Sequence, residues 1–213
     1  MAIVYKKTIE SEIKSIEEAT KFLEASIARV KQLELGAPSS KRCELLALAL
    51  KELIIGVKFL AAFLSVKFNE PQIKQLPNYG GYRRALISEL KIAMSVSKAI
   101  IERTKVKWPE EGRPLPLTWG VQDLNRVVKD MRGFLKLLRE QLGFNPPEKQ
   151  KELLLEELLE LYGLFRALIV GFRCQASVLA NRLMEECPAI YDSLMRSIKS
   201  EIAQLMRIIG LYV

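Results

Sequence analysis

Rows of lysine and arginine in the middle of the chain have a type and spacing that suit the binding of phosphate groups. In a helix predicted over about 82–106, basic side chains recur every seventh residue, which places them on one face about 10 Å apart. This row consists of Arg84, Lys91, Lys98 and Lys105, with Arg83 beside it. In a helix predicted over about 119–142, the second row consists of Lys129, Arg132, Lys136 and Arg139. Such rows can follow a nucleic-acid backbone without reading bases.

The excess of positive charge is concentrated in the same region. The 213-residue chain has a formal net charge of +8, and residues 76–146 carry 13 basic and 7 acidic side chains. If the two basic helices are antiparallel neighbours, both rows face outward and form one ridge of positive potential. Two alternatives stay open: a solvated surface, or a docking face for the acidic row Glu152, Glu156 and Glu160 of the fifth predicted helix, within this chain or from another copy.

Glycines and aromatic residues flank the first basic helix. The turn 78–81 (Asn-Tyr-Gly-Gly) precedes it, and Arg83 and Arg84 follow, so free backbone amides and two guanidinium groups are expected to form an anion site. The alternative is a glycine turn with solvated arginines. Four aromatic residues near the ends of the two helices could stack on unpaired bases: Tyr79, Tyr82, Trp108 and Trp119.

The sequence excludes most catalytic chemistry that a helical protein can host. Histidine is absent, which rules out Ser-His-Asp and Cys-His nucleophiles and the histidine-containing zinc and di-iron motifs. No phosphate-binding P-loop is present. Glu152, Glu156 and Glu160 align on one face of a helix, but a metal centre in a bundle needs carboxylates on several facing helices, so a solvated face is expected. We therefore predict no catalytic residues, no metal and no cofactor.

The three cysteines have no metal-binding or redox spacing. Cys43, Cys174 and Cys187 are predicted to be buried as small apolar side chains, with a Cys174–Cys187 disulfide as the alternative. The abundance of Glu and Lys over Asp is typical of proteins from hot habitats. The first residues lack the apolar core of a signal peptide, so a cytoplasmic location is expected.

Apolar periodicity predicts an all-α protein, a single bundle of about six long amphipathic helices, mostly antiparallel, in one domain over 1–213. The expected helices cover about 8–35, 39–68, 82–106, 119–142, 145–186 and 188–209, and a proline-rich strap covers 107–118. The second helix, apolar over much of its circumference, belongs at the bundle centre. The apolar stretches 45–66 and 158–172 contain charged residues, and the second is short, so no membrane span is expected.

Small residues in the fifth predicted helix also indicate close packing. Gly163, Ala167 and Gly171 recur every fourth residue and form a smooth strip, whose partner is either another helix of the chain or a second subunit. Together these features predict a non-enzymatic, nucleic-acid-associated helical bundle, acting as an accessory subunit or coating protein. The alternative is an oligomeric scaffold assembled through helices of complementary charge, and self-association or a protein partner is expected in either case.

Overall fold

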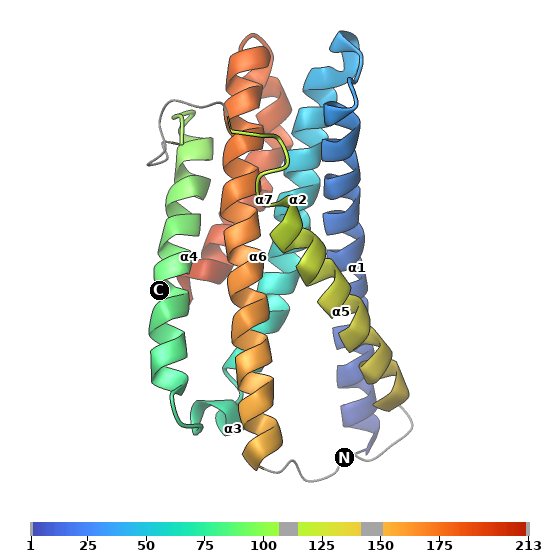
Figure 1. Ribbon diagram of the computed structural model, residues 1–213, viewed down its shortest axis with the longest axis vertical. Coiled ribbons are helices and arrows are strands. Elements are labelled where there is room, and N and C mark those ends of the chain that lie inside the picture. Colours follow the sequence, from blue (N-terminus) through green and yellow to red (C-terminus); the bar gives the residue numbers. More distant parts are fainter. Residues whose placement is uncertain (1, 107–114, 142–150, 212–213) are drawn as a thin grey trace.

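Seven helices make up the regular structure of the described residues, and the all-α prediction is confirmed (Figure 1). The computed structural model describes residues 2–106, 115–141 and 151–211, with side chains described over 10–106, 115–139 and 155–211. The helices are α1 (Ala2–Glu34), α2 (Ser39–Phe68), α3 (Pro71–Lys74), α4 (Tyr79–Ile101), α5 (Val121–Gln141), α6 (Lys151–Glu186) and α7 (Tyr191–Gly210). Six of them are long, and the short α3 lies between the second and third predicted helices, where the sequence pattern predicts none.

The first two helices form an antiparallel hairpin. Gly36, with φ of 92°, ends α1 in the left-handed region that glycine adopts readily. The heptad positions Ile16, Leu23 and Val30 are fully buried against α2, as their spacing predicts. Ion pairs Arg29–Glu52 (2.7 Å) and Lys67–Glu12 (2.8 Å) hold opposite ends of the hairpin together.

The prediction that α2 forms the centre of the bundle is confirmed. It packs against α1, α6 and α7, and its buried residues lie on nearly every side of the helix. One connected hydrophobic cluster takes side chains from all seven helices. Within the described residues, Leu155–Glu186 is long and apolar enough to cross a membrane, but 67% of its most apolar window is buried in the protein, as in a core helix.

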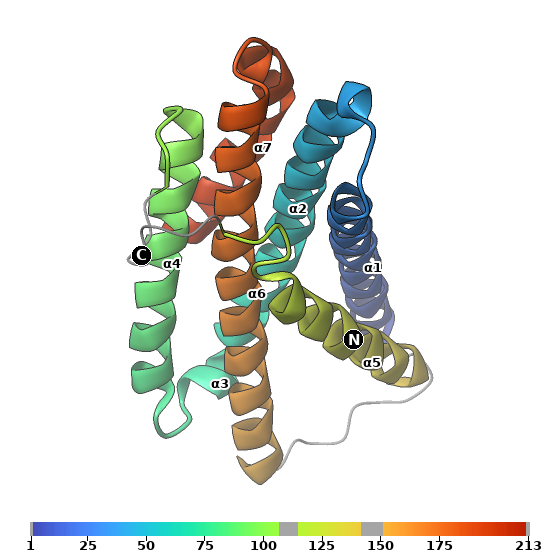
Figure 2. The same cartoon turned by 45° about the horizontal axis from the view of Figure 1, so that its top comes forward.

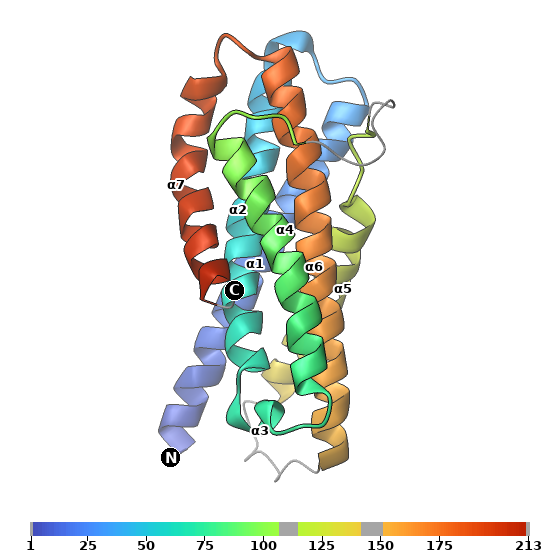
Figure 3. The same ribbon diagram turned by 90° about the vertical axis from the view of Figure 1, so that its left-hand side faces the viewer.

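Helix α4 packs parallel to α6, in a nearly constant register. The Tyr82 ring packs at a tilt against Tyr162, and Lys105, beyond the end of α4, pairs with Glu185, so partners are separated by 80 residues at both ends of the contact. Helices α2 and α7 also run in the same direction (Figures 1 and 3). Other principal contacts, such as those of α1 with α2, α2 with α6 and α4 with α7, are antiparallel, so the expectation of mostly antiparallel packing holds only approximately, with these two parallel exceptions.

The start of α5 crosses α6 at a close contact between two glycines, Gly120 just before α5 and Gly171 in α6. A Cβ atom at Gly171 would lie 2.9 Å from Leu124 Cγ, and one at Gly120 would lie 2.7 Å from the Gly171 carbonyl oxygen. The partner of the smooth strip at Gly171 is thus α5 of the same chain, whereas Gly163 faces open space. The chain entering α5 is fixed by Gln175, whose amide donates to the Leu117 carbonyl at 2.7 Å.

Parts of two predictions lie outside the described residues. These are residues 107–114 of the proline-rich strap, including Trp108, and the start of the fifth predicted helix at 145–148. The described residues on both sides of 107–114 are bound to α6. Asn181 exchanges hydrogen bonds with the backbone of Val106, and Gln175 binds Leu117, so α6 fixes the chain on each side of 107–114.

Candidate nucleic-acid interface

The basic row of α4 lies on the exposed side of the helix. Its members Arg84 and Lys91 form no ion pair within the described chain, and Lys98 only approaches Glu102, at 3.7 Å. Lys105 lies beyond the end of α4 and pairs with Glu185 at 3.0 Å. Because exposed ion pairs of this kind contribute little to stability, these cations remain accessible to an anionic ligand.

The α4 row also points away from α6. Glu89 marks the flank that faces α6, since its carboxylate lies 2.9 Å from Arg173 and 3.7 Å from Arg166. Successive residues of an α-helix are rotated by about 100°, so Lys91, two residues later, lies about 200° around the axis. Arg84 and Lys98, one heptad away on each side, share that direction.

The basic row of α5 is divided between two roles. Arg132 and Arg139 pair with Glu24 and Glu17 of α1, each at 2.5 Å, and so attach α5 to α1. Lys129 and Lys136 are exposed and have no ion pair within the described residues. The acidic partners of Arg132 and Arg139 therefore come from α1 rather than from the fifth predicted helix, and half of this row is neutralised within the chain.

The two basic rows do not form one ridge. Helix α4 packs against α6 and α7, whereas α5 packs against α1 and α6, so α6 lies between the two basic helices (Figures 1 and 2). The two basic helices are therefore not neighbours, and the condition on which a single ridge was expected is not met. Both described ends of the connection between α4 and α5 are bound to α6, Val106 through Asn181 and Leu117 through Gln175, although helices adjacent in sequence usually pack together.

The start of α4 has few free amides for an anion. Tyr79 donates its backbone amide to the Leu76 carbonyl, and Gly81 and Tyr82 donate theirs to Asn78. Asn78 adopts the left-handed conformation with φ of 67°, which turns its carbonyl into the first helical turn. Arg83 and Arg84 are both exposed. This arrangement corresponds to a glycine turn with solvated arginines.

The described aromatic side chains proposed for base stacking, which exclude Trp108, are packed or half-buried in the protein. Tyr79 packs on Phe68, with ring centroids 5.1 Å apart, and its hydroxyl donates to Asn69. Tyr82 packs on Tyr162 at 4.8 Å, and Trp119 is half-buried. The rings of Tyr79 and Tyr82 thus serve the fold, and the exposed side chains of the candidate interface are its cations.

The acidic row of α6 does not converge with other ligands. Glu156 and Glu160 are exposed, and the side chain of Glu152 lies outside the described residues. Across the described part of the chain, no group of three or more Cys, Asp or Glu side chains is arranged to hold a metal ion.

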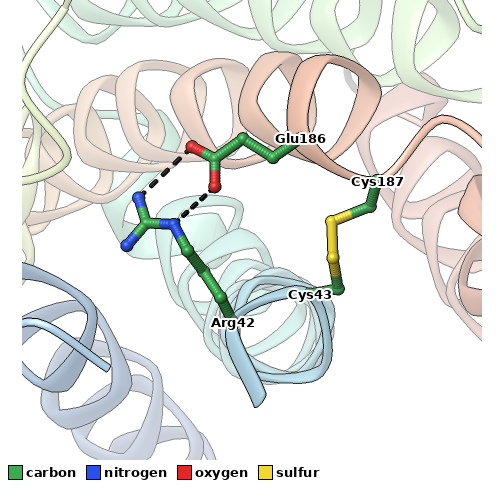
Figure 4. Close-up of a disulfide and its surroundings, with 4 residues drawn as sticks. All are labelled: Arg42, Cys43, Glu186 and Cys187. Carbon is green, nitrogen blue, oxygen red and sulfur yellow. Dashed lines mark hydrogen bonds and ion pairs between the residues drawn. A yellow bond between two sulfur atoms is a disulfide. The ribbon is translucent and has the colours of Figure 1, made fainter. Parts of the chain in front are cut away.

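A disulfide joins Cys43, near the start of α2, to Cys187, directly after α6 (Figure 4). Their Cα atoms lie 5.9 Å apart, because α2 and α6 are antiparallel neighbours. The expectation of unbridged cysteines is thus wrong for Cys43 and Cys187, and the alternative Cys174–Cys187 pairing is also wrong. Cys174 could not reach Cys187, since 13 residues of helix span about 20 Å, far beyond disulfide reach. Sequence alone does not reveal a pairing across 144 residues.

An ion pair flanks the disulfide. The Arg42 guanidinium binds both carboxylate oxygens of Glu186, at 2.5 and 3.2 Å, so neighbouring residues of both helices are joined twice (Figure 4). The hydrogen bond to Glu186 raises the pKa of Arg42. Bidentate geometry makes this pair more directional than a lysine contact would be.

Cys174 is the free cysteine and is buried, as predicted. Burial raises its pKa from 9.0 to about 11, so the thiol stays protonated and unreactive at neutral pH. We expect a thiol reagent at pH 8 to label no cysteine in the folded, oxidised protein and one after unfolding, as counted by mass spectrometry. Rapid labelling of the folded protein would contradict this assignment, and a Cys174→Ala variant should show no label in either state.

The same pKa shift gives a pH dependence of stability. Because the folded-state pKa lies above the unfolded-state value, the contribution of Cys174 is fully present below about pH 9 and is lost as the pH rises through about 11. The Cys174→Ala variant should therefore show a smaller loss of melting temperature over this range.

Comparison with protein-family models, with curated proteins and with solved structures found no significant match to this chain.

Proposed function

We propose that this protein is a non-enzymatic helical bundle that binds the phosphate backbone of DNA or RNA through the outer flank of α4, as an accessory subunit or coating protein. The observation that carries this proposal is the exposed row of Arg84, Lys91 and Lys98, which faces away from α6. Two of the three cations have no ion-pair partner among the described residues, and the third has a distant, exposed one.

The spacing of this row supports backbone contact rather than base readout. Cations repeated every seven residues present a charge about every 10 Å along a straight helix. Neutralising phosphates releases condensed counterions, which drives binding of any sequence. The half-buried rings of Tyr79 and Tyr82 on α4 already pack on Phe68 and Tyr162, so their stacking on bases adds little.

Helix α5 is assigned a smaller share of the binding. Only Lys129 and Lys136 of its row are free of ion pairs, and nearby α1 adds carboxylates that repel phosphate. Glu10, Glu18 and Glu34 of α1 have no ion-pair partner among the described residues. The α1–α5 side therefore carries charges of both signs.

Neutral substitutions on α4 test the proposal directly. We expect the triple variant Arg84→Gln, Lys91→Gln, Lys98→Gln to bind mixed-sequence oligonucleotides at least about tenfold more weakly at low salt. Its plot of log affinity against log salt should become less steep by up to about three units, one per lost phosphate contact. Fluorescence anisotropy between 50 and 200 mM salt measures both quantities.

A control of equal charge change separates location from net charge. The variant Lys14→Gln, Lys21→Gln, Lys31→Gln removes three exposed lysines of α1 and should keep most of the wild-type affinity and slope. Equal losses in the α4 and α1 variants would contradict a localised site. If the wild type binds no oligonucleotide but forms a salt-sensitive multimer by light scattering, the scaffold alternative is favoured instead.

A further inference from the structure

Helix α7 carries a second set of exposed cations that sequence reasoning did not select. Its basic residues Arg196 and Arg207 are exposed and Lys199 is half-buried, and none forms an ion pair within the described chain. Both carboxylates of α7 are paired, Asp192 with Arg103 and Glu201 with Lys58. The unpaired charges of this helix are therefore all positive.

Contacts at one end of the bundle place these cations beside the α4 row. The Tyr191 hydroxyl donates to the Ile100 carbonyl at 3.1 Å, and Arg103 binds Asp192 at 3.1 Å. The two helices run antiparallel from this contact, so Lys98 and Lys91 on α4 follow in the same direction as Arg196 and Lys199 on α7. Figure 3 shows α4 with α6 on one side and α7 on the other.

The helical rotation directs the α7 cations toward the same side. Glu201 and Gln204 bind Lys58 and so mark the flank of α7 that faces α2. Asp192 marks the flank that faces α4. Lys199 lies one heptad after Asp192 and Arg196 lies one turn after it, so both project from the α4 side of α7.

The combined face has a single sign of unpaired charge. On α4, its last turn and α7, every described carboxylate is paired: Glu89, Glu102, Asp192 and Glu201. The cations without ion pairs on these helices are Arg83, Arg84, Lys91, Arg196, Lys199 and Arg207. The α1–α5 side differs, because unpaired carboxylates are interspersed with its lysines.

We propose, on the basis of the nucleic-acid role proposed above, that α7 completes the interface and that its ligand is a double-stranded nucleic acid. Packed helices lie about 8–10 Å apart, so the face offers two roughly parallel rows of cations. Two strands across a duplex groove supply two rows of phosphates, whereas a single strand supplies one. The face formed by Arg84, Lys91 and Lys98 of α4 with Arg196, Lys199 and Arg207 of α7 is called the α4–α7 face.

Neutral substitutions on α7 test this assignment. We expect the triple variant Arg196→Gln, Lys199→Gln, Arg207→Gln of the full chain to bind a mixed-sequence duplex about tenfold more weakly than wild type at low salt. The salt slope should become less steep by about two to three units, and the loss for a single strand of the same length should be smaller. Glutamine is chosen because glutamate would also repel phosphates bound at α4.

The outcomes distinguish this assignment from the proposed function. If the α7 variant behaves like the α1 control while the α4 variant loses binding, α7 is excluded and the nucleic-acid role stands. If the wild type prefers single strands, the duplex assignment is wrong. If the wild type binds neither oligonucleotide but binds phosphatidylserine vesicles, with loss in both variants, the ligand is an anionic membrane and both proposals are overturned. Circular dichroism confirms that each variant is folded.

Discussion

Removing the Cys43–Cys187 disulfide is expected to lower the free energy of unfolding by about 2–5 kcal/mol. The bond closes a loop with a sequence separation of 144 residues, and long loops lose the most chain entropy when they are cross-linked. The variant Cys43→Ala, Cys187→Ala should therefore unfold at a clearly lower urea concentration than the oxidised wild type. Chemical denaturation followed by circular dichroism measures the difference.

Reduction provides the matched comparison for this variant. Wild type treated with a thiol reductant should approach the stability of the double variant, and the reductant should not affect the double variant. The Cys174→Ala variant keeps the disulfide and should retain the response to reductant. If oxidised wild type and double variant unfold at the same urea concentration, the bond contributes no stability and this expectation fails.

Gly120→Ala is expected to destabilise the protein by about 2–4 kcal/mol. Gly120 has φ of 91°, a conformation that residues with a side chain adopt only with strain. Its added Cβ would lie 2.7 Å from the Gly171 carbonyl oxygen and 2.9 Å from Cys174 Cβ, so α5 and α6 would have to separate. Thermal and urea unfolding measure the loss.

Gly133→Ala on the outer face of α5 is the control for this substitution. No atom lies within 4 Å of the position that its Cβ would occupy. Alanine is the better helix former, so this variant should gain roughly 0.5–1 kcal/mol. Opposite signs for the two substitutions on neighbouring parts of the chain would confirm that the close crossing, and not glycine content, determines the effect.

Most helices could be predicted because their positions depend on apolar periodicity and on proline and glycine residues close in sequence. Helix α2 begins and ends at the predicted residues. Pro38 directly precedes its first turn, and Pro71 lies shortly after its last turn. Short or irregular features were missed for equally local reasons. The four residues of α3 are too few for a periodic signal, and α4 begins three residues early because Asn78 and Leu76 supply carbonyl partners to a glycine-rich turn.

Features that depend on distant residues could not be predicted from local patterns. The Cys43–Cys187 pairing requires the antiparallel contact of α2 with α6, and the partners of Arg132 and Arg139 lie on α1, more than a hundred residues away. The spacing rule correctly placed the α4 cations on an exposed face. It could not show that α7, rather than α5, is the basic helix beside them.

The disulfide also gives the chain a particular topology. Residues 43–187 form a closed covalent ring, from which the two remaining segments leave at positions whose Cα atoms are 5.9 Å apart. Both segments return to the same helix, since α1 and α7 each pack along α2. A single backbone cut anywhere in the ring would therefore leave one covalently connected molecule, with α1 and α7 still joined to it, until the disulfide is reduced.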